Sequence, residues 1–157
     1  MTSTVEDLIA RYRAGVGLVE AALASLSDGD LDRAVDDGWT ARMVVHHLAD
    51  SETNSYVRLR RLLAEPVGTT IQGYDEGAWA RTPALGYATE PIELSLAVLR
   101  SVRASSAELL SRVSDGDFER AGVHTESGTY TLMDWLRIYA EHAEQHAEQI
   151  LAVRAGE

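Results

Sequence analysis

The sequence predicts an all-α protein, a four-helix bundle with one long crossover connection. Four segments place apolar residues at three- and four-residue steps, the spacing that gives a helix one apolar face. Between the second and third segments, residues 65–90 contain two prolines and four glycines, so this connection should not be regular structure. A connection of that length in a compact domain is usually a crossover or a functional loop. We expect one domain, residues 1–157.

The first predicted helix runs from about Thr4 to Leu26. Its apolar face consists of Leu8, Tyr12, Val16, Val19, Leu23 and Leu26. Gly15 and Gly17 interrupt the pattern, and a glycine inside a helix costs about 1 kcal/mol relative to alanine. They are either two weak points or the mark of a neighbouring helix that approaches closely, and the sequence does not decide between these.

The second predicted helix runs from Thr40 to about Ala64. Thr40 follows Gly38 and Trp39 and is a suitable N-cap, because its hydroxyl can accept a bond from a free backbone N–H. The inward face is expected to hold both apolar and small polar residues, namely Val44, His47, Leu48, Ser51, Ser55, Leu59 and Leu62.

The third predicted helix begins at Pro91, a favoured residue of a first helical turn, and continues to Val113. The fourth begins at Thr131, and Thr131 with Asp134 resembles a capping box. Its inward face consists of Trp135, Tyr139, His142, His146, Ile150 and Val153. We expect Trp135 in the core, and Trp39 as well.

The chain contains a faint internal repeat. Residues 26–34 (LSDGDLDRA) match residues 113–121 (VSDGDFERA), and each copy is followed by an aromatic residue and a threonine that open a histidine-bearing helix. Acidic turns of this composition also arise by coincidence. The matching context on both sides favours two helical hairpins of related design.

Composition excludes several classes of function. The formal net charge is −11, so we do not expect nucleic acid as a partner. There is no cysteine, which excludes disulfides, a cysteine-ligated zinc site and a cysteine nucleophile. No apolar run approaches the roughly 20 residues that span a bilayer, and the N-terminus does not resemble a signal peptide. We therefore expect a cytoplasmic protein with no membrane partner.

Three histidines are candidate metal ligands. His142 and His146 are four residues apart, so on a helix their imidazoles lie one above the other and can converge on one ion. Both fall on the apolar face, and His47 falls on the inward face of another helix beside small serines. The alternatives are a solvated histidine pair and a lone core histidine; the three residues together favour a metal site.

Three histidines with no fixed fourth ligand are typical of a catalytic metal. The open position would hold water, whose pKa the ion would lower toward neutrality, or a substrate group that the ion would polarise, so the catalytic group itself stays undefined. Imidazole ligands suit Zn, Ni, Cu, Co or Fe. We expect one divalent ion, with Zn or Ni favoured.

Other polar residues are assigned less specific roles. We interpret His46 as a residue behind the ligands or at the surface, and His124 as exposed by chance. Carboxylates or amides that could bond to the back of an imidazole are Asp50, Glu141, Glu144 and Gln145, unless they are simply solvated. In the long connection, Tyr74 and Trp79 either anchor the loop or form the wall of a pocket, with Asp50 a third candidate for that pocket.

These motifs resemble those of the DinB/YfiT-like metalloenzymes, in particular the YfiT-like branch. The likeness rests on GWTARMVVHHLADS (residues 38–51), NSYVR (54–58), YDEGAW (74–79) and YxxHxxxHxxxI (139–150). The resemblance implies a four-helix bundle with a long crossover, often a homodimer, with the metal held by His47, His142 and His146. The sequence departs from the family at residues 143–145, where further histidines are frequent.

The resemblance also implies a class of reaction. Relatives include mycothiol and bacillithiol S-transferases, so our first hypothesis is a metal-dependent S-transferase that uses a low-molecular-weight thiol. Arginine without any lysine suggests a GC-rich genome and leans toward mycothiol. The second hypothesis is a metal-dependent hydrolase that activates water, and the third is a non-catalytic metal-binding module.

Overall fold

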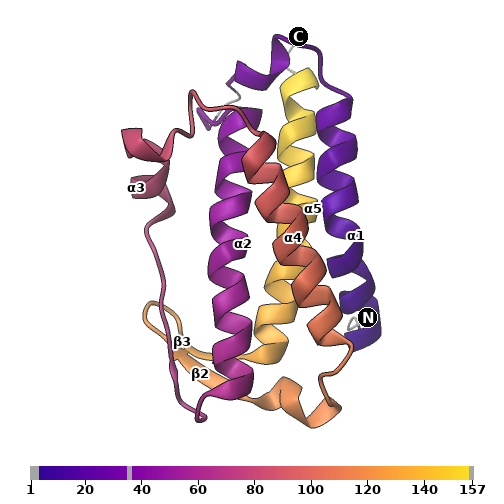
Figure 1. Ribbon diagram of the computed structural model, residues 1–157, viewed down its shortest axis with the longest axis vertical. Helices are drawn as coiled ribbons and strands as arrows, with labels where there is room; N and C mark the ends of the chain where they lie inside the picture. The colour runs from indigo at the N-terminus through magenta and orange to yellow at the C-terminus, as the bar shows by residue number, and fades with distance from the viewer. Residues whose placement is uncertain (1–3, 35–36, 156–157) are drawn as a thin grey trace.

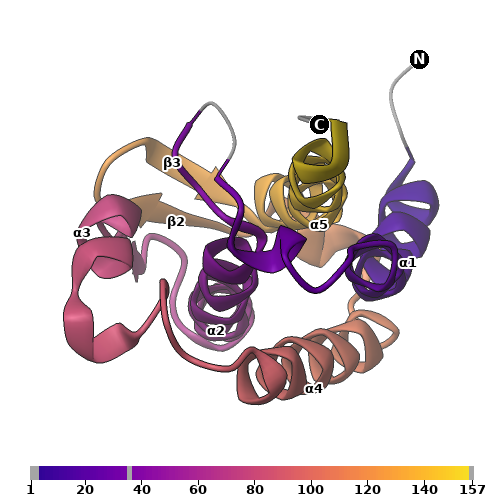
Figure 2. The same cartoon turned by 90° about the horizontal axis from the view of Figure 1, so that it is seen from above.

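A computed structural model describes residues 4–34 and 37–155 and confirms the bundle (Figure 1). Its four long helices are α1 (Val5–Ala24), α2 (Ala41–Ala64), α4 (Glu93–Leu110) and α5 (Leu132–Ala155). Seen from above, they occupy the corners of a quadrilateral in which α2 and α1 lie on opposite sides (Figure 2). No helix among the described residues is long and apolar enough to cross a membrane.

The caps predicted for the second and fourth helices are present, and the first helix has a cap at Thr4 that we did not predict. The Thr4 hydroxyl accepts a bond from Asp7 N (3.1 Å), and Thr40 accepts one from Met43 N (3.2 Å). The capping box before α5 is present, because Asp134 N donates to Thr131 Oγ1 (3.0 Å) and Thr131 N to Asp134 Oδ2 (2.9 Å). The third helix is shorter than predicted: α4 begins at Glu93, after Pro91, and ends at Leu110.

The structure adds a small three-stranded sheet that the all-α prediction missed. Strands β2 (Ala121–His124) and β3 (Gly128–Thr131) form an antiparallel hairpin, and β1 (Thr70–Ile71) pairs with β2 in parallel. Each strand has four residues or fewer, which is too short for an alternating pattern to stand out. The hairpin lies beside the lower half of α2 and leads directly into α5 (Figure 1).

The long connection is more regular than predicted. It contains β1, the short helix α3 (Glu76–Arg81) and a 3₁₀ helix (Pro83–Leu85), and it passes along the outer side of α2 (Figures 1 and 2). Asp75 caps α3 by accepting a bond from Ala78 N (2.9 Å), which explains a helix in a connection where we expected no regular structure.

The two copies of the repeat adopt the same local structure. In the first, Ser27 Oγ donates to Asp30 Oδ2 (2.7 Å), and in the second, Ser114 Oγ donates to Asp117 Oδ2 (2.6 Å). These hydrogen bonds, together with those from the serine N–H groups, lower the pKa of both carboxyls. A 3₁₀ helix follows each serine, Asp30–Asp32 and Asp115–Glu119. The two turns that precede the histidine-bearing helices therefore share one design.

A buried polar layer separates two apolar clusters. One cluster surrounds Trp135, which is fully buried as predicted and donates from Nε1 to Ser55 O (3.0 Å). The other surrounds Leu48 and Ile150. Trp39 packs against this second cluster but is only half-buried, so we were wrong to expect it fully in the core. Glu52 on α2 lies between the two clusters.

An ion pair that we did not predict occupies this layer. Arg103 Nη1 donates to Glu52 Oε1 at 2.8 Å, and the two side chains are 3% and 0% exposed. Arg103 also donates to the carbonyl oxygens of Tyr139 (2.8 Å) and Tyr12 (2.6 Å), so it connects α4 with α2, α5 and α1. Burial raises the pKa of the Glu52 carboxyl, and Arg103 opposes that rise.

The structure decides the question raised by the two glycines of α1. A Cβ on Gly15 would lie 2.4 Å from Arg103 Nη2 and 2.7 Å from the Cβ of Ala143, whereas a Cβ on Gly17 would meet nothing within 4 Å. Gly15 therefore marks a close approach, and Gly17 is a weak point on the exposed side of the helix.

We expect opposite effects when each glycine is replaced by alanine. Gly15→Ala should lower the free energy of unfolding by about 1–3 kcal/mol, because the new methyl group overpacks the contact with Arg103. Gly17→Ala should raise it by about 0.5–1 kcal/mol, because alanine loses less backbone entropy in a helix. Urea unfolding of the two variants measures both, and a shift of the same sign in both would contradict this reading.

Candidate metal centre

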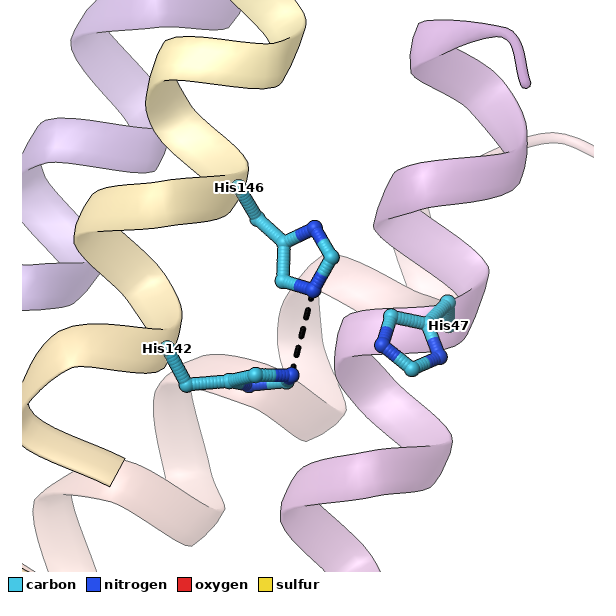
Figure 3. Close-up of side chains that lie close together, drawn as sticks. All are labelled: His47, His142 and His146. Atoms are coloured by element: carbon cyan, nitrogen blue, oxygen red, sulfur yellow. Dashed lines mark hydrogen bonds between the residues drawn. The ribbon is translucent and has the colours of Figure 1, made fainter. Parts of the chain in front are cut away.

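The three predicted histidines come together between α2 and α5. Figure 3 shows His47 of α2 facing His142 and His146, which lie one turn apart on α5. Their candidate ligand atoms all lie within 4.8 Å of one another. The His146 and His142 Nε2 atoms are 3.1 Å apart. Two nitrogens bound to one zinc ion at about 2.0–2.1 Å would be about 3.3 Å apart in a tetrahedron, so this spacing suits a shared ion.

All three imidazoles are electrically neutral near pH 7. Burial lowers the pKa of His47 to about 4, with a smaller contribution from His146. Burial also lowers the pKa of His142 well below its ordinary value, and that of His146 to a lesser degree. A neutral imidazole keeps a lone pair for a metal ion. The donor set therefore fits a divalent ion such as Zn, Cu, Fe or Ni, all of which imidazole suits.

The hydrogen bonding of the cluster also fits a metal site better than a structural one. The Nδ1 atoms of His47 and His142 are buried and have no hydrogen-bond partner. Among the described residues, the three rings share one bond with each other, and only His146 bonds to another side chain. Buried polar groups are normally paired, so three imidazoles packed together in this way need a further partner.

Aromatic side chains surround the imidazoles. The Trp39 ring meets His47 edge-on, with centroids 5.6 Å apart, and the Tyr139 ring meets His142 in the same way at 5.8 Å. Ser51 lies one turn beyond His47 on α2 and is buried. Among the described residues, the group of candidate ligands contains three side chains and no carboxylate, so it provides no fourth protein ligand.

The residues predicted to lie behind the ligands have other roles. Asp50 accepts a bond from the Tyr87 hydroxyl (2.6 Å). Glu144 pairs with Arg11 at 2.6 Å, which lowers the pKa of its carboxyl. Gln145 is exposed, and Glu141 is half-buried without a bond to an imidazole. The residue that does bond to a ligand is Gln149, whose Oε1 lies 2.7 Å from His146 Nδ1. Its position three residues after His146 was an available signal.

Neither of the remaining histidines belongs to the centre. His46 is buried, and its Nδ1 and Nε2 contact Ser95 Oγ (2.7 Å) and Glu90 O (3.0 Å). It therefore ties α2 to the start of α4 and to the end of the long connection, and it is not a surface residue. His124 Nδ1 accepts a bond from Glu126 N (3.1 Å) and stabilises the hairpin turn, so its position is not a matter of chance exposure.

The predicted pocket residues lie close to one another. Asp50 and Trp79 line a cavity of about 450 Å³ between α2 and the long connection, together with Arg58 and Arg61. Tyr74 packs against Trp79, with ring centroids 4.5 Å apart, and its hydroxyl is buried. Tyr74 therefore packs within the long connection itself, and Trp79 lies at the wall of the cavity, so whether this cavity binds a substrate stays a prediction.

Comparison with known proteins places this chain in a family. A model of the DinB superfamily matches residues 11–150. The chain belongs to the DinB superfamily. The resemblance inferred from the motifs is therefore confirmed, and the three candidate metal ligands all fall within the matched range.

Related members have been assigned provisionally to the metal-dependent hydrolases. One, from Oceanobacillus iheyensis, is 35% identical over 137 residues, which is 87% of this chain and 77% of that protein. Another, from Bacillus mycoides, is 36% identical over 117 residues, 74% of this chain and 65% of that protein. The structure of YfiT from Bacillus subtilis, a four-helix bundle of unusual topology with the same provisional assignment, matches with a TM-score of 0.87 and 31% identity. That match covers 99% of this chain and 91% of YfiT.

Proposed function

We propose that this protein is a metal-dependent hydrolase whose single divalent ion is held by His47, His142 and His146. The observation that carries the proposal is the convergence of three neutral imidazoles from two helices, with no carboxylate in the group. Such an arrangement leaves room for an exchangeable ligand. When bound there, a divalent ion would lower the pKa of a water molecule toward neutrality and polarise a carbonyl oxygen.

The names of the relatives change the order of our hypotheses. The sequence put a thiol S-transferase first, whereas the relatives described above support hydrolysis. Hydrolysis of an amide or ester joins the hydroxyl of water to the carbonyl carbon, breaks the C–N or C–O bond and delivers a proton to the leaving nitrogen or oxygen. S-transfer is retained as an outcome that the experiment below detects.

Neighbouring side chains support a polar substrate. Arg58 donates from Nη1 to the Tyr139 hydroxyl (3.0 Å) and from Nη2 to Gln72 O (2.8 Å), which fixes its guanidinium at the cavity beside Trp79. Its Nε is buried without a partner. Burial raises the pKa of the Tyr139 hydroxyl to about 12, so this group stays protonated. We therefore infer a small substrate with hydrogen-bond acceptors, approaching from the side of Arg58.

The test begins with metal content. Protein purified without an affinity tag should contain, or take up, about one Zn or Ni ion per chain, and His47→Ala and His146→Ala should lose it. His124→Ala is the matched control, because His124 lies in the hairpin and should leave the metal content unchanged. A wild-type protein that takes up neither ion would overturn the proposal.

The reaction is then tested on metal-loaded protein. A panel of small amides and esters, assayed for the released acid, should give turnover that disappears in His142→Ala. Mycothiol or bacillithiol with an electrophile is assayed in parallel, and the cobalt-substituted protein is titrated with each thiol. Thiolate-to-cobalt absorption with thioether formation, and no hydrolysis, would establish the S-transferase instead.

A further inference from the structure

Hydrogen bonds connect the Nδ1 side of the His146 ring to the segment that precedes α2. Gln149 Oε1 lies 2.7 Å from His146 Nδ1, and Gln149 Nε2 donates to Asp37 Oδ2 at 2.8 Å. Asp37 Oδ1 in turn accepts a bond from the backbone N–H of Trp39 (2.9 Å), whose ring faces His47. One short segment before α2, residues 37–39, therefore contacts histidines on both helices of the metal centre, directly or through Gln149.

The direction of these bonds follows from their chemistry. An ionised carboxylate can only accept hydrogen bonds, so the NH₂ group of Gln149 must face Asp37 and the amide oxygen must face His146. An amide oxygen also only accepts, and so Nδ1 of His146 must carry the hydrogen. Its Nε2 then carries a lone pair, which in the metal-free protein accepts a hydrogen bond from His142 Nε2 (3.1 Å) and which a metal ion can take instead. The chain of bonds thus selects the tautomer of His146 that can bind a metal through Nε2.

We propose that Gln149 and Asp37 are positioning residues that hold His146 in its metal-binding tautomer and hold Trp39 beside His47. This proposal rests on the metal centre proposed above. Groups that bond to the back of a ligating imidazole typically change metal affinity 10- to 100-fold when they are removed. Gln145, one turn earlier on α5, is exposed and makes no such bond, so it provides a matched control.

The first experiment compares the two glutamines. Metal affinity is measured by competition between the protein and a chromophoric chelator for Zn²⁺ and Co²⁺. Gln149→Ala should bind both ions 10- to 100-fold more weakly than the wild type, whereas Gln145→Ala should bind them equally well. Circular dichroism confirms that both variants are folded. Equal affinities for Gln149→Ala and wild type would overturn the proposal.

The second experiment tests the direction of the bonds. In Asp37→Asn the partner of Gln149 can donate as well as accept, so the Gln149 amide is free to rotate and to present its NH₂ group to His146. We expect metal affinity to fall about 10-fold or more. In the double variant Asp37→Asn/Gln149→Glu, the new carboxylate accepts both from His146 and from the amide introduced at position 37, so affinity should return to within a few-fold of the wild type. A double variant as weak as Asp37→Asn would contradict the assigned tautomer.

A third measurement does not depend on metal. Long-range ¹H–¹⁵N NMR spectra of the metal-free protein report which nitrogen of His146 carries the hydrogen. We expect Nδ1–H in the wild type and in the double variant, and a loss of that preference in Asp37→Asn. A wild-type His146 protonated on Nε2 alone would overturn the inference. Metal binding with this tautomer, but without hydrolysis of any substrate, would overturn the proposed function and leave the inference intact.

Discussion

Arg103→Met is expected to destabilise the protein by about 3–5 kcal/mol, because it leaves the buried Glu52 carboxylate without its counter-ion. Arg103 also supplies hydrogen bonds to two backbone carbonyls, so its removal disturbs three helices at once. Urea unfolding at pH 7 measures the change. Arg112→Met, which breaks an exposed pair with Glu108, is the matched control and should shift stability by no more than about 0.5–1 kcal/mol.

The double variant Glu52→Leu/Arg103→Met separates the loss of the pair from the presence of an unpaired charge. Replacing both members of a buried pair with apolar residues is often neutral or stabilising, so the double variant should recover most of the loss. The recovery should be incomplete, since the carbonyls of Tyr12 and Tyr139 still lack their donor. A double variant less stable than Arg103→Met would show that the ion pair itself holds the bundle together.

The decrease in the free energy of unfolding caused by Arg103→Met should depend on pH. Burial already raises the pKa of Glu52, and removal of Arg103 takes away the main influence that opposes this rise. The folded variant then binds the Glu52 proton more tightly than the unfolded chain does, so its stability falls as the pH rises through the range between the unfolded and folded pKa values. We expect Arg103→Met to be closer to the wild type at pH 5 than at pH 8.

The sequence predicts a structural feature of this protein well when the contact that determines the feature joins residues that are close in the chain. The caps at Thr40 and Thr131 use residues three positions away, and both were predicted correctly. The pair His142 and His146 also lies within one helix, and helical periodicity places it inward. The partnership of Gln149 with Asp37 joins residues 112 positions apart, and no local pattern reveals it.

The buried ion pair shows a signal that was present and was overlooked. Glu52 follows Leu48 by four residues and precedes Ser55 by three, so it falls on the inward face of α2. On α4, Arg103 likewise follows Leu99 by four residues and precedes Ser106 by three. Opposite charges at matching inward positions of two helices predict a buried pair. The chemistry of the proposed metal centre could not be predicted in this way, because one open metal position would serve a hydrolase and a transferase alike.

Metal binding is expected to produce the second large change in stability. An ion that binds only the folded chain stabilises it by about 2.7 kcal/mol at 100 times Kd and by about 4.1 kcal/mol at 1,000 times Kd. Urea unfolding of the wild type with and without Zn²⁺ should show this increase. His146→Ala removes one of the three ligands, so most of the increase should disappear.

In the metal-free protein, His47→Leu should keep or raise the free energy of unfolding, whereas the replacement of a buried residue usually lowers it. His47 is 3% exposed, its Nδ1 has no partner, and it makes no hydrogen bond to the described residues, so an apolar side chain of similar size removes a buried unpaired polar group. We expect the metal-free variant to be at least as stable as the metal-free wild type, and to gain no stability from Zn²⁺. If His47 were a structural core histidine, the same substitution would instead lower stability by about 1–3 kcal/mol. Urea unfolding in the presence of a chelator measures the difference in unfolding free energy between His47→Leu and the wild type. The sign of that difference shows whether His47 serves metal binding or core packing.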